Sequence, residues 1–165
     1  MLKNNHYIFS YVIIVFFCSC DSKQIFDEYQ SLPTKWNKDS IINFNITAPD
    51  STKSYNLFVN LRNNKDYKYS NLQLIVALEY PNGKTEKDTL EYAMAKPNGE
   101  FLGEGFTDVK ENKLWYKGYD SDFKFTEIGN YKVSVQQAMR ENGQVEGIEN
   151  LDGIMAVGFR IENSN

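Results

Sequence analysis

Hydrophobic side chains occupy every second position in most of the chain after residue 40. A period of two places alternate side chains on opposite faces of an extended backbone, so each such segment predicts a strand with one face in the core. Besides the segments whose apolar sets follow, the segments 113–119 ("KLWYKGY") and 123–128 ("FKFTEI") are predicted to be strands. The clearest apolar sets are Ile42, Phe44 and Ile46; Tyr55, Leu57, Val59 and Leu61; Leu72, Leu74, Val76, Leu78 and Tyr80; Tyr131, Val133 and Val135; and Val157, Phe159 and Ile161.

Turn residues separate these predicted strands. In "YPNGK" (80–84), Pro81 restricts φ and Gly83 accepts a positive φ, which predicts a tight hairpin leading into "TEKDTLEYAM". No apolar stripe with helical spacing extends beyond about two turns. About eight strands separated by turns predict an all-β fold, an antiparallel β-sandwich that is immunoglobulin-like or jelly-roll-like. The pattern leaves the topology open.

An apolar run at the amino terminus predicts an export signal. Residues 7–17 are too few to cross a bilayer as a mature helix. The next residues, "CSC" (18–20), place two small side chains before Cys20, as a bacterial lipoprotein signal peptidase requires. We therefore expect residues 1–19 to be a cleaved signal peptide and Cys20 to carry the lipid. Phe17 departs from the aliphatic residue usual in such a motif, which leaves an uncleaved signal anchor as the alternative.

Two other interpretations of the cysteine pair are weaker. A disulfide between Cys18 and Cys20 would close a strained ring. A zinc site would need additional Cys or His ligands, which the sequence lacks around this pair.

The next segment changes character before the alternation begins. Residues 20–40 are polar with scattered apolar side chains, and Pro33 interrupts them. We interpret this segment as the lipidated amino terminus and a tether, docked onto the domain by Trp36. Residues 41–165 are then the β-sandwich domain.

Composition narrows the function. A chain of 165 residues is long enough for one domain, and its net charge of −4 lacks the basic surface that nucleic-acid binding requires. Cleavage before Cys20 would remove Lys3, giving −5, and also His6, the single histidine. Without histidine or a free thiol, triad-type nucleophilic sites, histidine-ligated zinc and thiol redox chemistry are excluded. We expect no enzyme activity, no cofactor and no metal.

Four residues are candidates for a binding surface. Trp115, Tyr116 and Tyr119 form the most concentrated aromatic group, which would suit a partner or a glycan. We favour a core position for Trp115, with Tyr116 on the opposite face of the same strand. Arg160 points away from the apolar face of its strand and could mark an interaction surface. Ordinary salt bridging is the interpretation we favour for it.

Two further chemistries have weak support. Asp120 and Asp122 resemble a fragment of a calcium loop, but such a loop supplies more ligands, so a solvated turn is favoured. A glycosidase would need two carboxyl groups facing each other across a cleft, which the sequence does not reveal.

Several long stretches together resemble one protein family. They include "FDEYQSLPTKWNKDS", "YNLFVNLRNNKDYKYSNLQLIV", "YPNGKTEKDTLEY", "KPNGEFLGEGFTDVKENKLWYK" and "GNYKVSVQQAMRENG". With the lipobox-like Cys20, they resemble the gliding-motility lipoprotein GldH family of Bacteroidota across essentially the whole mature chain.

The resemblance implies a cell-envelope lipoprotein needed for gliding and functionally tied to type IX secretion. It implies no catalytic residue and no cofactor, and it transfers one role, lipid attachment at Cys20. The expected partners are the membrane and other gliding or secretion proteins of the envelope, and the preferred site is the outer membrane, facing the periplasm. The alternative function is a polysaccharide-binding envelope lipoprotein that uses Trp115, Tyr116 and Tyr119.

Overall fold

Strands are the only regular secondary structure among the described residues. The computed structural model describes residues 22–119 and 121–164. Its strands are β1 (Gln24–Ser31), β2 (Lys35–Asn37), β3 (Ile42–Thr47), β4 (Tyr55–Asn63), β5 (Asn71–Glu79), β6 (Thr85–Ala93), β7 (Lys110–Lys117), β8 (Asn130–Gln137), β9 (Asn150–Asp152) and β10 (Ile154–Asn163). The described part holds no helix of the length and apolarity that crossing a bilayer requires. The all-β prediction is confirmed.

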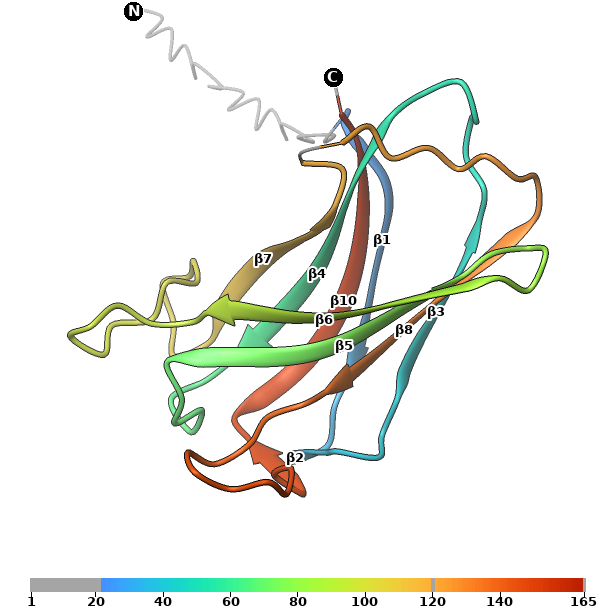
Figure 1. The fold of residues 1–165 in the computed structure, drawn as a ribbon. Coiled ribbons are helices and arrows are strands. Elements are labelled where there is room, and N and C mark those ends of the chain that lie inside the picture. The colour runs from blue at the N-terminus through green and yellow to red at the C-terminus, as the bar shows by residue number, and fades with distance from the viewer. Residues whose placement is uncertain (1–21, 120, 165) are drawn as a thin grey trace, which may run out of the picture.

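Two four-stranded antiparallel sheets form the body of the domain. One has the order β1-β10-β4-β7 and is called the β10 sheet below; the other has the order β3-β8-β5-β6 and is called the β5 sheet. A short β2-β9 pair lies beside them. Figure 1 shows the β5 sheet in front of the β10 sheet, with the strands of the two sheets crossing. This arrangement is consistent with a β-sandwich.

The core lies between the two sheets and uses the predicted alternation. Val59, Val76 and Val157 are fully buried, as are most members of the predicted apolar sets. The rings of Phe44 and Phe159, from opposite sheets, stack with their centroids 6.0 Å apart. Burying each aliphatic or Phe side chain stabilises the fold by about 1.5–3 kcal/mol, so the inner faces hold the sheets together.

The predicted hairpin is confirmed. β5 and β6 pair along their length, from Asn71 opposite Ala93 to Glu79 opposite Thr85. Gly83 in the turn has a φ of 85°, which an L side chain rarely adopts.

The strand predicted at 123–128 is wrong. This segment makes one isolated bridge, between Phe123 and Tyr55. Its alternating aromatic residues fill the end of the core: the fully buried Phe125 ring packs edge-on against Tyr131, with centroids 4.9 Å apart. The apolar alternation in this segment therefore indicates buried side chains, but the segment does not pair with a neighbouring strand.

The segment interpreted as a tether contributes strands to the sheets. β1 pairs with β10 from Gln24 onward, and β2 pairs with β9. Trp36 is completely buried, and its Nε1 donates a hydrogen bond to the Ser40 carbonyl at 2.9 Å. The inward-facing Gln30 is polar, and its Nε2 donates a hydrogen bond to the Asn43 carbonyl at 2.6 Å. A polar residue at this position interrupts the apolar alternation by which β1 could have been predicted.

Candidate functional site

One row of side chains crosses the outer face of the β10 sheet. Asp27 pairs with Arg160, Arg160 with Phe58, and Phe58 with Trp115, on β1, β10, β4 and β7 in turn. We call these four residues the outer row. The sheet thus brings two of the sequence candidates, Arg160 and Trp115, onto one surface although they are far apart in the chain.

Trp115 lies on this outer face, so the expected core position is wrong. Its side chain is 38% exposed, and its ring centroid lies 4.4 Å from Phe58 and 5.1 Å from Tyr119. Leu114 takes the buried position in β7. Lys113 shares the outward parity of Trp115, and this parity was the sequence signal for an exposed ring. Lys117 follows a β-bulge and instead contacts Glu86 and Asp88 of the other sheet.

Tyr116 occupies the opposite face of β7 and points between the sheets. Its ring packs edge-on against Phe159, with centroids 6.3 Å apart. Burial, reinforced by the nearby Asp88 carboxylate, raises the pKa of the Tyr116 hydroxyl well above its ordinary value. Tyr116 is therefore part of the interior packing.

The three candidate rings do not form a platform for sugars. Tyr116 is on the wrong face, and the planes of Trp115 and Tyr119 are tilted by 57°. Tyr119 itself is 74% exposed. Stacking on a pyranose needs ring faces aligned in one plane, so the polysaccharide site expected at these residues lacks its required geometry.

Arg160 is held in a partly buried ionic network, which confirms ordinary salt bridging. Its Nη1 lies 2.7 Å from Asp27 Oδ2, and its Nε lies 2.6 Å from Glu162 Oε1. Lys113 Nζ also contacts Glu162 Oε1, at 2.7 Å, while lying 4.1 Å from the centre of the Phe58 ring. The network therefore connects the ionic and the aromatic halves of the outer row.

The pKa of Glu162 reflects this network. Burial alone would raise it, but hydrogen bonds from Lys113 and Arg160 outweigh burial and bring the pKa below its ordinary value. Glu162 thus stays ionised in the folded protein.

A second contact group covers the β1 side of the same face. The Tyr29 hydroxyl donates to Glu111 Oε1 at 2.5 Å, and Arg62 Nε lies 3.2 Å from Glu111 Oε2. The Arg62 guanidinium also lies 4.1 Å from the centre of the Tyr29 ring. The ring covers Gly158, where an added Cβ would lie 2.8 Å from Tyr29 Cδ1.

Sequence reasoning missed Phe58, Asp27, Glu162 and Lys113. For Phe58 a signal existed, because it is apolar at the parity of Asn56 and Asn60. Among the charged partners, Glu162 lies two residues from Arg160 on the same face of β10, which is a local signal. Asp27 and Lys113 have no such signal, since only the pairing of distant strands brings them to this network.

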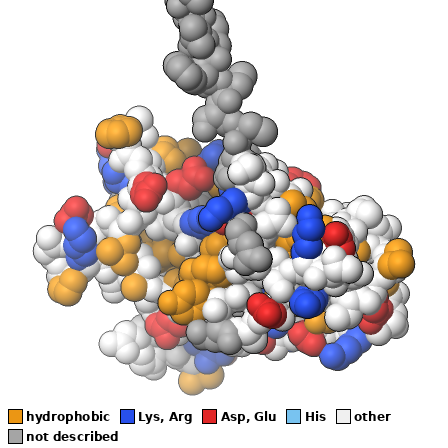
Figure 2. Space-filling model, turned by 90° about the horizontal axis from the view of Figure 1, so that it is seen from above, with side chains coloured by type: hydrophobic (Ala, Val, Ile, Leu, Met, Phe, Trp, Pro, Cys, Tyr) orange, Lys and Arg blue, Asp and Glu red, His pale blue; other side chains and the backbone are white. Residues whose placement is uncertain are grey.

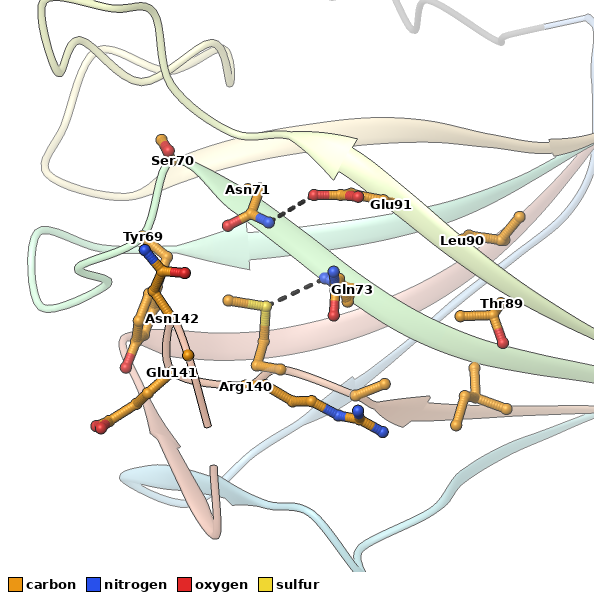
Figure 3. Close-up of a pocket in the computed structure, with 14 residues that line it drawn as sticks. Tyr69, Ser70, Asn71, Gln73, Thr89, Leu90, Glu91, Arg140, Glu141 and Asn142 are labelled. Carbon is orange, nitrogen blue, oxygen red and sulfur yellow. Dashed lines mark hydrogen bonds between the residues drawn. The ribbon is translucent and has the colours of Figure 1, made fainter. Parts of the chain in front are cut away.

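The outer face of the β5 sheet carries an open groove of about 1250 Å³. Its polar lining includes Asn71, Gln73, Glu91 and Arg140, with Tyr69 at one end. Figure 3 shows Asn71 hydrogen-bonded to Glu91, at 2.6 Å, and Arg140 on the opposite side of Gln73. Across residues 22–119 and 121–164, Arg140 has no ion-pair partner.

Two sequence candidates fall outside the described residues: the lipid-attachment residue Cys20 and the calcium candidate Asp120. In the part of the chain that is described, no group of three or more His, Cys, Asp or Glu side chains could hold a metal ion.

The fold and the outer face define the class of this protein: an all-β domain of two antiparallel sheets with an exposed aromatic and ionic surface. The chain belongs to the GldH lipoprotein family, whose family model matches residues 24–161.

Two curated relatives are similar over nearly their whole length. The gliding motility lipoprotein GldH homolog of Christiangramia forsetii is 58% identical over 159 residues, which is 96% of this chain and 95% of the relative. The gliding motility lipoprotein GldH of Flavobacterium johnsoniae is 52% identical over 164 residues, 99% of each chain.

Solved structures add no functional argument. A family GH115 4-O-methyl-alpha-glucuronidase overlaps with a TM-score of 0.42 at 9% identity, covering 88% of this chain and 18% of the enzyme chain. A similarity this low carries no conclusion.

Proposed function

We propose that this chain is a non-catalytic cell-envelope lipoprotein required for gliding motility. It acts as an accessory or structural component of the gliding machinery linked to type IX secretion. The observation that carries the proposal is the 52% identity to the Flavobacterium johnsoniae protein across 99% of both chains. In this proposal the domain is held at the outer membrane and faces the periplasm.

The anchor in this proposal is a lipid on Cys20, after removal of residues 1–19. Each buried methylene of an acyl chain contributes about 0.8 kcal/mol, so more than one chain gives stable attachment. The outer face of the β10 sheet is the surface we assign to contacts in the envelope. Trp115 and Tyr119 supply exposed apolar area there, while Arg160 is already engaged by Asp27 and Glu162.

The proposal is tested by complementing a strain that lacks the gene. The wild-type chain should restore spreading and incorporate radiolabelled fatty acid, whereas Cys20→Ala should do neither. Val145→Ala, a change at an 81% exposed position outside the groove and the outer row, is the control that should retain both. Continued labelling of Cys20→Ala would refute lipid attachment at Cys20, and normal spreading of the deletion strain would refute the role in gliding.

Binding of a polysaccharide is the second candidate function, and the groove on the β5 sheet is the observation that favours it. Amide, carboxylate and guanidinium groups from Gln73, Glu91 and Arg140 line the groove. Such groups hydrogen-bond sugar hydroxyls, and Tyr69 adds an aromatic ring. If the groove binds a polysaccharide, variants of these residues that keep their stability should fail to restore spreading in the complemented strain.

A further inference from the structure

The described chain begins at one end of the β10 sheet. The Lys23 carbonyl accepts a hydrogen bond from the Asn163 amide at 2.9 Å, and the Ser164 amide donates to the Ser54 carbonyl at 3.1 Å. Gly118 packs against Tyr55 at the same end. Figure 1 shows the start of β1, the carboxyl terminus and the start of β4 together there. We call this the anchor end.

The distance from Cys20 to the anchor end is short. Four peptide units separate Cys20 from Gln24, the first residue of β1. A fully extended chain spans at most ~3.6 Å per residue, so Gln24 lies within about 14 Å of the Cys20 backbone. The headgroup region on each side of a bilayer is roughly 5–7 Å thick. A lipid on Cys20 therefore holds the anchor end against the membrane surface.

Exposed apolar side chains lie at this same end. Tyr119 follows Gly118 directly, Ile25 follows Gln24 and is exposed, and the Trp115 ring packs at a tilt against Tyr119. Figure 2 looks onto this end, where hydrophobic side chains lie among both basic and acidic side chains. Trp and Tyr rings favour the boundary between headgroups and acyl chains, because one part of each ring is apolar and another can hydrogen-bond.

We propose that Trp115, Tyr119 and Ile25 form a membrane-contact surface that seats the anchor end in the lipid headgroup region. This inference rests on the proposed lipidation of Cys20 and adds an orientation: the β10 sheet stands with its anchor end on the bilayer and leans toward its aromatic outer face. The groove on the β5 sheet is then left open to the aqueous side.

The two tryptophans of the chain make this orientation measurable. Trp36 is completely buried, so lipid that contacts the domain surface changes the emission of Trp115. The full chain, purified in its lipidated form, is reconstituted into phosphatidylcholine vesicles whose acyl chains carry bromine close to the headgroup. Brominated lipid should lower the tryptophan emission of the wild-type chain relative to unbrominated lipid, and Trp115→Phe should abolish this loss.

Relocated tryptophans give a graded control in the Trp115→Phe background. Tyr119→Trp should be quenched more strongly than Trp115, because position 119 is closer to the end. Phe106→Trp should not be quenched. Phe106 is fully exposed and lies before Lys110, at the end of β7 away from the membrane. At ~3.3 Å per residue, Lys110 is about 23 Å from Lys117, which lies at the anchor end. In Trp115→Phe the remaining emission comes from the buried Trp36 and reports that this background is folded, and circular dichroism checks the relocated variants.

Flotation of the same samples distinguishes the lipid anchor from the membrane-contact surface. If the chain floats with the vesicles but Trp115 and Tyr119→Trp are as unquenched as Phe106→Trp, the membrane-contact surface is refuted and the lipid anchor stands. Such a result would leave the aromatic face to a protein partner. If mass spectrometry of the purified wild-type chain shows no acyl mass on Cys20, the proposed lipid anchor is refuted, and this inference falls with it.

Discussion

The two outer faces of this domain use similar side chains in different ways. On the β10 sheet, Arg160 contacts two carboxylates at 2.6–2.7 Å, and rings cover the neighbouring strands. On the β5 sheet, Arg140 lines an open groove. A polar residue on the outer face of a sheet can therefore either hold strands together or remain available to a ligand. Local sequence does not distinguish the two.

The largest expected effect distinguishes the two arginines. The side chains of Arg160, Asp27 and Glu162 are only 14%, 18% and 11% exposed. Arg160→Ala removes the cation that contacts Asp27 and one of the two cations that contact Glu162, so we expect the free energy of unfolding to fall by about 2–4 kcal/mol. Arg140→Ala should change it by less than about 0.5 kcal/mol. Urea unfolding followed by circular dichroism measures both, and equal losses would contradict the comparison.

The next largest effect concerns Gly158 of β10, which the Tyr29 ring covers. In Gly158→Val the new Cβ would lie 2.8 Å from the Tyr29 ring and 3.0 Å from the Glu28 carbonyl oxygen. Because the backbone of β1 cannot yield as a side chain can, we expect a loss of about 1–3 kcal/mol in unfolding free energy.

A double-mutant cycle with Tyr29→Ala identifies the cause of that loss. Removing the ring first should make Gly158→Val less costly, since the contacting groups are then no longer independent. If the two losses simply add in urea unfolding, the ring is not what excludes a side chain at position 158.

A smaller effect is expected from acid. The pKa of Glu162 in the folded protein lies below its ordinary value of 4.5, so its contribution to stability is full above that value and is lost as pH falls through the folded pKa. Glu162→Gln should therefore flatten the fall of unfolding free energy below pH 4.5. Glu91→Gln, in the exposed groove, serves as the control. An unchanged acid slope in Glu162→Gln would show that the network does not hold this carboxylate ionised.

The same contrast explains how much the sequence could predict. Alternation identified the inner faces of β3, β4, β5, β8 and β10, and a turn motif identified the β5–β6 hairpin, because burial and turn geometry are local. It failed for β1, whose inward Gln30 is polar. It also placed Trp115 in the core, because hydrophobicity alone does not show which parity of a strand faces inward. The contact of Arg160 with Asp27 requires strand pairing across 133 residues, which no local pattern contains, whereas Glu162 lies only two residues away on the same strand.

The smallest expected effect tests the groove itself. Glu91 accepts a hydrogen bond from Asn71 Nδ2 at 2.6 Å, but the contact is exposed, so Glu91→Ala should change the unfolding free energy by less than about 0.5 kcal/mol. Thermal and urea unfolding measure this directly. Because the fold would be unaffected, a loss of spreading by Glu91→Ala in the complemented strain would point to a ligand in the groove and favour the polysaccharide function. A stability loss as large as that of Arg160→Ala would instead show that both outer faces hold the strands together.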